Sequence, residues 1–464
     1  MFSKDNMKHL LSENYPIFGI LIGIMFVSLS IGPFHNGDTD WEFEAAKGVL
    51  HWGLPYVISF GNIINQPPLG FYIEALFFKG FGLSIINGTF LVTLLGIGST
   101  VVIYKIGKEI YGKATGLFAA VLFALSPWEL VLSRSFLIDV QCLFFSLLCL
   151  YAGILAIRKG SVKLSSVSGV FFAAALLTKY FAVFMLIPLL IFWLYSKPKK
   201  AKVFLSQMIG FALPALLFSL LWYQVVLGKN LLYMFVHRDF TDLNYIGVNP
   251  SYSFVGVFLW NYGLGVLFVV AIAFSLILLF AFRKELPKTF RFDIICLATI
   301  LPILLVDIIL GAVLNLKAPY NNAIKYDYFA LPFFCLIAAS IVGKCVFVLN
   351  LPKFKPKINK KLIFTTVIAG VLLLAITIYA NFVSAHHLSM SDYLLFRVRM
   401  DQIVGYSLLN SSPINQDSFL MGLQYLGFAF VLSGLLWASR HKLHGIFSVS
   451  KLRINSNETK NLKP

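Results

Sequence analysis

Long apolar segments recur along almost the whole chain, and they constrain its fold more than any other feature. A helix needs about 20 apolar residues to cross a hydrocarbon core of about 30 Å, and the chain has about twelve stretches of this kind. Of the 464 residues, 59% are hydrophobic and 12% are charged, whereas about 25% of the residues in soluble domains are charged. We therefore predict an all-α polytopic membrane protein with about 11 to 13 transmembrane helices.

The predicted spans are residues 15–34, 84–106, 114–132, 136–157, 165–178, 181–196, 204–227, 254–282, 292–314, 328–348, 362–384 and 418–438. The fifth and sixth are short, and the alternative is one kinked span. The first follows a polar segment without a small-residue cleavage site, so we interpret it as a retained anchor.

The distribution of charge predicts the orientation. Lys and Arg concentrate in alternate short loops, including SKPKKAK (196–202) and PKFKPKINKK (352–361). Because cytoplasmic loops carry the excess of basic residues, we expect both termini in the cytoplasm and a multi-pass protein of the cell membrane. Residues 1–440 then form the transmembrane domain and residues 441–464 a basic tail. The net charge of +18 reflects this topology and contact with anionic lipids, and it does not indicate a nucleic-acid partner.

The outer loops are longer than the inner ones, which predicts that the working surface faces outward. They cover residues 35–83, 228–253, 315–327 and 385–417, and ordered loops longer than about 12 to 15 residues usually carry function. We expect two juxtamembrane helices in the first of them. The segment TDWEFEAAKGVLHW (39–52) has an apolar face at helical spacing, formed by Trp41, Ala45, Val49 and Trp52.

The limits of these two helices are also predicted. Thr39 and Glu42 have the T-x-x-E spacing of a capping box, which would start the first helix near Asp40. Pro67 and Pro68 end any earlier helix, so the second is expected over residues 69–81.

Four acids gather in this loop, in a chain that has only 20 Asp and Glu residues. Asp40, Glu42 and Glu44 are expected in the first half of the helix, where acids favour the positive end of the macrodipole and otherwise face water. Asp38 would precede the cap, close to where the first span leaves the bilayer. A carboxylate partly shielded from water there suits a general base.

Basic residues occur at several predicted outer turns. Arg134 and Asp139 bracket the turn between the third and fourth spans, Lys179 lies between the fifth and sixth, and Lys325 and Tyr328 enter the tenth. Helix-end ion pairing, snorkelling and interfacial anchoring are the structural alternatives. Cations that converge beneath a carboxylate would form a site for a phosphate group next to a base.

Other polar residues give weaker indications of a functional site. His237 and Arg238 could contact substrate or belong to a solvated loop, and Asp307 falls inside the ninth span. His386 and His387 lack the i, i+4 spacing of a helical metal pair, so no metal site is predicted. The five cysteines form no CxxC pair and are expected to be buried apolar residues.

Five segments in order resemble a known family. They are DTDWEFEAAKGVL, NQPPLGFYIEALFFKGFG, SPWELVLSRSFLIDVQCLFF, LLTKYFAVFMLIPLL and YFALPFFCLIAASI. Together they resemble the GT-C superfamily of polytopic glycosyltransferases, in particular the dolichyl-phosphate-mannose protein mannosyltransferases and the lipid A aminoarabinose transferases. The resemblance implies an inverting transfer of a sugar from a polyprenyl-phosphate carrier to an acceptor at the outer face.

The resemblance also implies residue roles. The catalytic aspartate of the family falls on Asp38, its second acidic position with a preceding Arg falls on Asp139 with Arg134, and its Lys falls on Lys179. The basic, Tyr-containing segment falls on Lys325 and Tyr328, with Leu331 and Pro332. These cations would hold the donor phosphate, with Asp38 as the base.

The chain departs from the family pattern at three positions. Thr39 follows Asp38 where an acid is common, which makes Asp40 a reserve candidate and leaves Glu44 as a possible substrate contact. Gln66 stands where relatives often carry Lys or His, and it can donate hydrogen bonds without charge. Tyr180 replaces the usual Gly after Lys179.

Two other functions remain open from the sequence. A transporter or flippase of lipid-linked sugars also needs many spans with intramembrane charge, although no repeated halves are evident. An outer-face polysaccharide polymerase or ligase would use similar donors. The sugar, the acceptor (protein, glycan or lipid) and any need for a divalent metal are not determined.

Overall fold

The computed structural model describes residues 37–64, 66–124, 132–196, 201–221, 265–313 and 328–349, together with the single residues 19, 23, 126 and 129. The described part is helical apart from one two-stranded hairpin. Its elements are α2 (Gly37–Trp52), β1 (Tyr56–Val57), η1 (Ile58–Phe60), β2 (Asn62–Ile63), α3 (Leu69–Phe81), α4 (Ile85–Tyr111), α5 (Lys113–Ala124), α7 (Ile138–Lys159), α8 (Val162–Leu176), η2 (Tyr180–Met185), α9 (Leu186–Ser196), α10 (Ala201–Leu220), α13 (Gly265–Ala281), η6 (Lys288–Arg291), α14 (Phe292–Val313), η7 (Tyr328–Ala330) and α16 (Leu331–Leu349).

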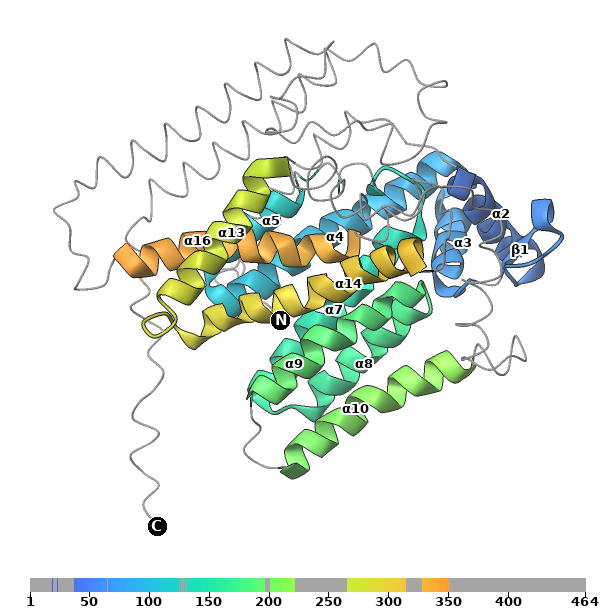
Figure 1. Cartoon of the computed structure of the whole chain (residues 1–464). Helices are drawn as coiled ribbons and strands as arrows, with labels where there is room; N and C mark the ends of the chain where they lie inside the picture. Colours follow the sequence, from blue (N-terminus) through green and yellow to red (C-terminus); the bar gives the residue numbers. More distant parts are fainter. Residues whose placement is uncertain are drawn as a thin grey trace, which may run out of the picture.

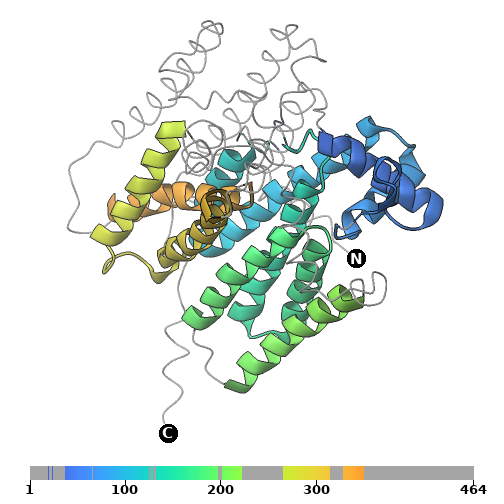
Figure 2. The same ribbon diagram turned by 45° about the vertical axis from the view of Figure 1, so that its right-hand side comes forward.

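The long helices form a bundle, and α2, α3 and the hairpin lie together at one end of it (Figure 1; Figure 2). We call this the α2–α3 end. Helix α7 packs against α4, α8 and α9, while α16 packs against α5, α13 and α14. The first turn of α7 and the turn before η2 therefore lie near the α2–α3 end, and the C-terminus of α4 lies at the opposite end.

Four described helices are long and apolar enough to cross a membrane: Ile85–Tyr111, Ile138–Lys159, Lys202–Leu220 and Tyr328–Cys345. They coincide with the predicted spans at 84–106, 136–157, 204–227 and 328–348. Helix α5 is shorter than the span predicted at 114–132, and α13 and α14 fall within the two predicted for 254–314. The spans predicted at 362–384 and 418–438 lie outside the described residues, as does most of 15–34.

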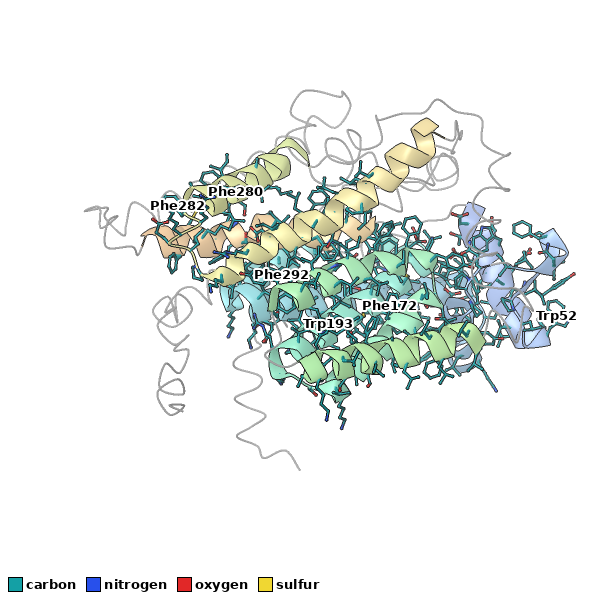
Figure 3. The ribbon with its side chains drawn as sticks, turned by 60° about the horizontal axis from the view of Figure 1, so that its bottom comes forward. Trp52, Phe172, Trp193, Phe280, Phe282 and Phe292 are labelled. Carbon is teal, nitrogen blue, oxygen red and sulfur yellow. The ribbon has the colours of Figure 1, made fainter. Side chains whose placement is uncertain are left out.

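The fifth and sixth predicted spans are two separate helices. Phe172 of α8 and Trp193 of α9 both contact Phe211 of α10, with ring centroids 5.4 and 5.7 Å apart (Figure 3). The chain therefore reverses between α8 and α9, and Lys179 lies in the turn where it does so. This arrangement favours two short spans over the single kinked one.

Close helix contacts depend on glycine. A Cβ atom at Gly107 of α4 would lie 2.6 Å from the Cα of Gly116 in α5, and one at Gly169 of α8 would lie 2.1 Å from the carbonyl oxygen of Phe211. Small residues at such positions let helix backbones approach closely, which is a main source of stability between membrane helices.

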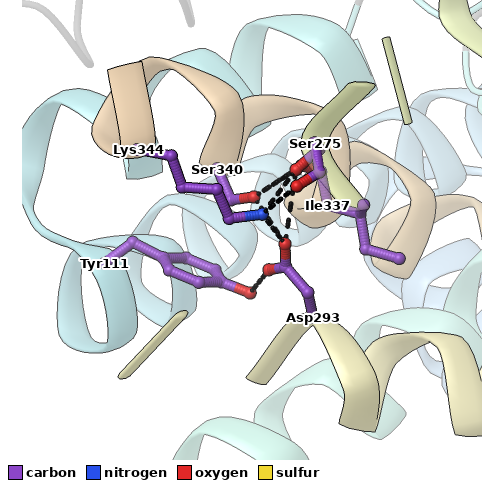
Figure 4. Close-up of polar contacts among 6 residues, drawn as sticks. All are labelled: Tyr111, Ser275, Asp293, Ile337, Ser340 and Lys344. Atoms are coloured by element: carbon purple, nitrogen blue, oxygen red, sulfur yellow. Dashed lines mark hydrogen bonds and ion pairs between the residues drawn. The ribbon is translucent and has the colours of Figure 1, made fainter. Parts of the chain in front are cut away.

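A buried polar cluster joins four helices at the end opposite α2 and α3 (Figure 4). Asp293 of α14 forms an ion pair with Lys344 of α16, and it accepts hydrogen bonds from Tyr111 of α4 (2.5 Å) and from Ser340 (2.8 Å). Lys344 also donates to the carbonyl oxygen of Ser275 in α13 at 2.8 Å. Each charge is paired and hydrogen-bonded, as burial requires.

The segment of residues 37–83, predicted as the first outer loop, differs from expectation in two ways. Helix α2 begins at Gly37, so Asp38 lies in its first turn and not ahead of a cap at Thr39. The strands β1 and β2 were not predicted in the connection between the two helices; they pair Tyr56 with Ile63 in antiparallel register. The second helix, α3, has the predicted limits.

The apolar face predicted for the first helix is largely confirmed. Ala45 is buried, and Trp41 and Val49 pack against the same small core, which also contains Ile138 of α7. Trp52 is 53% exposed and lies at the extremity of the molecule (Figure 3).

Candidate active site

A buried ion pair lies near the α2–α3 end of the bundle. Lys179 precedes η2, and its backbone N–H donates to the carbonyl oxygen of Ala175, which closes the last turn of α8. Its Nζ lies 2.6 Å from Oδ1 of Asp139, in the first turn of α7. The side chains are 8% and 0% exposed. Two of the residues that the sequence assigned to the site, Lys179 and Asp139, are thus in direct contact.

Arg134 lies in the turn that leads into α7. This turn is held by a bond from Ser133 N to Glu129 O (2.9 Å) and by one from the Thr93 hydroxyl of α4 to Ser133 O (2.8 Å). Arg134 is buried, and within the described part of the chain its Nε and Nη2 atoms have no hydrogen-bond partner. Burial lowers its pKa to about 10, so it remains a cation at neutral pH. Buried N–H donors of this kind suit an anionic group such as a phosphate.

Asp38 is half-buried in the first turn of α2. Its Oδ1 accepts a hydrogen bond from the indole Nε1 of Trp41 at 3.0 Å. The carboxylate of Asp38 is therefore held by a hydrogen bond within its own helix.

Two buried acids connect α2 and α3 to α7, and we did not predict either connection. Glu42, which was expected near the positive end of its own helix, is 1% exposed, and its Oε2 accepts the backbone N–H of Ile138 at 3.0 Å. Glu74 of α3 is fully buried, and its Oε1 accepts from Nε2 of Gln141 at 2.6 Å. Burial, and secondly the charge of Glu42, raises the pKa of Glu74 well above its usual value.

The burial of Glu42 had a signal in the sequence. Glu42 is three residues before Ala45 and four before Ala46, and both alanines are fully buried. Residues at these spacings share one face of a helix, so the helical period itself placed Glu42 on the buried side.

Tyr328 and Glu129 form a second buried contact. The hydroxyl of Tyr328, at the start of η7, donates to Oε2 of Glu129. Both side chains are buried, and Tyr328 is within electrostatic range of Asp139. Tyr328 was a predicted site residue, whereas Glu129 was not selected although it precedes Arg134 in the same quoted segment.

The remaining candidates are dispersed. Glu44 accepts hydrogen bonds from Ser59 N (3.0 Å) and from the Ser59 hydroxyl (2.8 Å), so it supports the hairpin. These bonds lower the pKa of Glu44. Asp40 is exposed and Gln66 is half-buried.

Several predictions lie outside the described residues. These are Lys325, His237, Arg238, the histidines at 386 and 387, and the side chain of Asp307. Among the residues that are described, no three His, Cys, Asp or Glu side chains are grouped as a metal site would need. The five cysteines are free thiols, and all but Cys345 are fully buried.

Comparison with known proteins identifies a matching family and two similar sequences. Residues 65–223 match the family of the dolichyl-phosphate-mannose-protein mannosyltransferases. Two proposed mannosyltransferases of Bacillus subtilis are similar over part of the chain: YkcB, at 30% identity over 139 residues, and YycA, at 26% over 148. These matches cover 29% and 32% of this chain but only 19% and 21% of the relatives, about a fifth of their length.

A solved structure has a similar fold. ArnT from Cupriavidus metallidurans superposes with a TM-score of 0.54 at 14% identity, covering 91% of this chain and 77% of ArnT, in its apo state and in its complex with undecaprenyl phosphate. The segment that matches the mannosyltransferase family contains Arg134, Asp139 and Lys179. The resemblance to the GT-C membrane glycosyltransferases is therefore confirmed, and the part of the chain around the buried ion pair is similar in sequence to the dolichyl-phosphate-mannose-protein mannosyltransferases.

Proposed function

We propose that this protein is an inverting glycosyltransferase that moves a sugar from a polyprenyl-phosphate carrier to an acceptor at the outer face of a membrane. The observation that carries the proposal is the buried Lys179–Asp139 pair beside a turn with a buried Arg134, within the segment that resembles the mannosyltransferases. That ArnT binds undecaprenyl phosphate on the same fold supports this donor class.

The proposed reaction assigns one role to each group. Asp38 takes the proton of the acceptor hydroxyl or amine as that atom bonds to the anomeric carbon. The bond from the anomeric carbon to the phosphate oxygen breaks, and the polyprenyl phosphate leaves with the additional negative charge. Arg134 and Lys179, with Lys325 and Tyr328, stabilise that charge.

Asp139 has a more specific role in this scheme. Because it is bonded to Lys179 at 2.6 Å, it fixes where the ammonium group points. A donor phosphate would share Lys179 with Asp139, so we propose that Asp139 orients the cation at the reacting phosphate. Asp40, Glu44, Gln66, His237 and Arg238 are proposed as further substrate contacts.

The topology that accompanies this function is also a proposal. We propose about twelve spans, α2 and α3 at the outer interface, both termini in the cytoplasm and residues 441–464 as a basic tail. Trp41 and Trp52 on α2 support the interfacial position, since tryptophan is enriched at the level of the lipid headgroups.

The experiment that tests the function is a transfer assay with the purified chain in lipid nanodiscs. Undecaprenyl-phosphate sugars with different head groups are supplied with peptide, glycan and lipid acceptors, and the released undecaprenyl phosphate is measured. We expect release with at least one pair. Movement of lipid-linked sugar across vesicles without release would instead establish a flippase.

A further inference from the structure

Helix α7 has an unusual start. Its N-cap residue is Leu137, which has no side-chain hydrogen bond to offer the helix. The first N–H groups of a helix have no partner within it, and a buried one must find an acceptor elsewhere. Here Oε2 of Glu42, from α2, accepts the N–H of Ile138 at 3.0 Å.

This bond joins the two sides of the candidate site. Asp139, which holds Lys179, is the residue directly after Ile138. Asp38 is four residues before Glu42, on the same face of α2 and about 6 Å away along the helix axis. Glu42 thus makes a direct contact between the helix that carries the proposed base and the helix that carries Asp139.

Charge strengthens the contact. Glu42 is almost completely buried, and the positive end of the α7 dipole favours a negative charge at this point. Burial, and secondly the charge of Glu42, raises the pKa of the nearby Glu74 well above its usual value. Glu74 in turn accepts a hydrogen bond from Gln141, which lies near the start of α7.

We propose that Glu42 is a positioning residue that holds α2, and with it Asp38, in register with the Lys179–Asp139 pair by capping α7. The effect on turnover rests on the proposed function. The structural link can be measured without turnover, so the two can fail separately.

The experiment compares Glu42→Ala with Glu42→Gln in the full chain in nanodiscs. Glutamine keeps an oxygen that can accept the N–H of Ile138, whereas alanine removes it. Leu50→Ala is the matched control, because Leu50 is an exposed residue of the same helix. Hydrogen exchange of residues 37–52 and 132–143 is measured first, and binding of undecaprenyl phosphate second.

We expect Glu42→Ala to increase exchange in both segments, and Glu42→Gln and Leu50→Ala to leave it close to wild type. Binding of undecaprenyl phosphate should change by less than about threefold, because the proposed phosphate ligands are intact. With the donor and acceptor that support transfer, kcat should fall by about 10- to 100-fold in Glu42→Ala, with the KM for the donor nearly constant, and Glu42→Gln should restore it.

Unchanged exchange in Glu42→Ala would overturn the proposal, and so would an unchanged kcat or a loss of activity in Glu42→Gln as large as in Glu42→Ala. If the wild type transfers no sugar, the proposed function fails, while increased exchange in Glu42→Ala would still establish the link between α2 and α7.

Discussion

At the scale of single residues, the candidate site is built from charges that are buried and mostly paired. Asp139 and Lys179 contact each other, while Arg134 has N–H groups without a hydrogen-bond partner among the described residues. A buried ion pair adds little net stability, but removing one partner leaves an uncompensated charge. The Lys179–Asp139 pair, which lies next to the turn with the buried Arg134, is therefore better explained by function than by stability.

Lys179→Met should destabilise the protein by about 3–5 kcal/mol, because it leaves the carboxylate of Asp139 buried without its cation. The double variant Asp139→Leu with Lys179→Met should recover most of this loss, yet remain inactive. Thermal unfolding in detergent measures stability, and the transfer assay measures activity. A double variant that regains activity would show that the pair has no role in the reaction.

Acidic pH should loosen the hairpin of β1 and β2. The two bonds from Ser59 hold the pKa of Glu44 below its usual value, so the folded state prefers the carboxylate. This stabilisation is present above the unfolded pKa of about 4.5 and is lost as the pH falls through the lower folded value. The effect is small because the group is solvated.

Limited proteolysis within residues 56–63 measures this effect. Cleavage should accelerate between pH 6 and pH 3, on the order of severalfold, and Glu44→Gln should cleave faster at pH 6 and lose the pH dependence. Equal pH dependence in Glu44→Gln would contradict the assignment to Glu44.

At the scale of elements, the apolar pattern of the sequence predicted those helices whose position is determined by nearby residues. The limits of α3 follow from Pro67 and Pro68, and the spans of α4 and α7 follow from hydropathy. The predicted start of α2 near Asp40 was wrong, since the helix begins at Gly37, and the carboxylate of Glu42 bonds to Ile138 of α7. This bond is a tertiary contact between residues 96 positions apart in sequence.

The rest of the site depends on contacts of the same long-range kind. Lys179 meets Asp139 only because α8 and α9 reverse direction around α7, and Tyr328 meets Glu129 across 199 residues. Composition identified these residue types, and the family resemblance selected most of them, but neither determines which partner each one takes. The hairpin at 56–63 lacked alternation long enough to predict strands.

Helix packing should be sensitive at Gly169. Gly169→Ala places a methyl group 2.1 Å from the carbonyl oxygen of Phe211, so α8 and α10 must separate, which should cost about 1–3 kcal/mol. Gly80→Ala in α3 is the control, since its Cβ meets nothing within 4 Å and alanine favours a helix. Thermal unfolding should show a loss for the first variant only; equal behaviour would contradict the close packing.

At the scale of the whole molecule, the polar features lie at two ends of a helical bundle. The candidate site is at the α2–α3 end, and the cluster of Asp293 and Lys344 is at the other (Figure 4). The cluster joins four helices without exposing a charge, which suits a structural role. The proposed outer location of the α2–α3 end gives the bundle a direction in the membrane.

This direction can be measured by cysteine labelling in intact cells. Phe60→Cys, in the exposed hairpin, should react with a membrane-impermeant maleimide from outside, whereas Lys284→Cys, between α13 and η6, should react only after permeabilisation. The native cysteines give little background, because four are buried and Cys345 is half-buried. Labelling of Lys284→Cys in intact cells would invert the proposed orientation.

The variant Asp38→Asn tests whether Asp38 is the base of the sugar transfer. Asparagine keeps an oxygen that can accept from Trp41, so the local structure should persist. We expect the transfer rate to fall by about 10²- to 10⁴-fold, while undecaprenyl phosphate binds as tightly as to wild type and Glu285→Gln, an exposed glutamate at the opposite end, remains active. Transfer at the wild-type rate by Asp38→Asn would contradict the account.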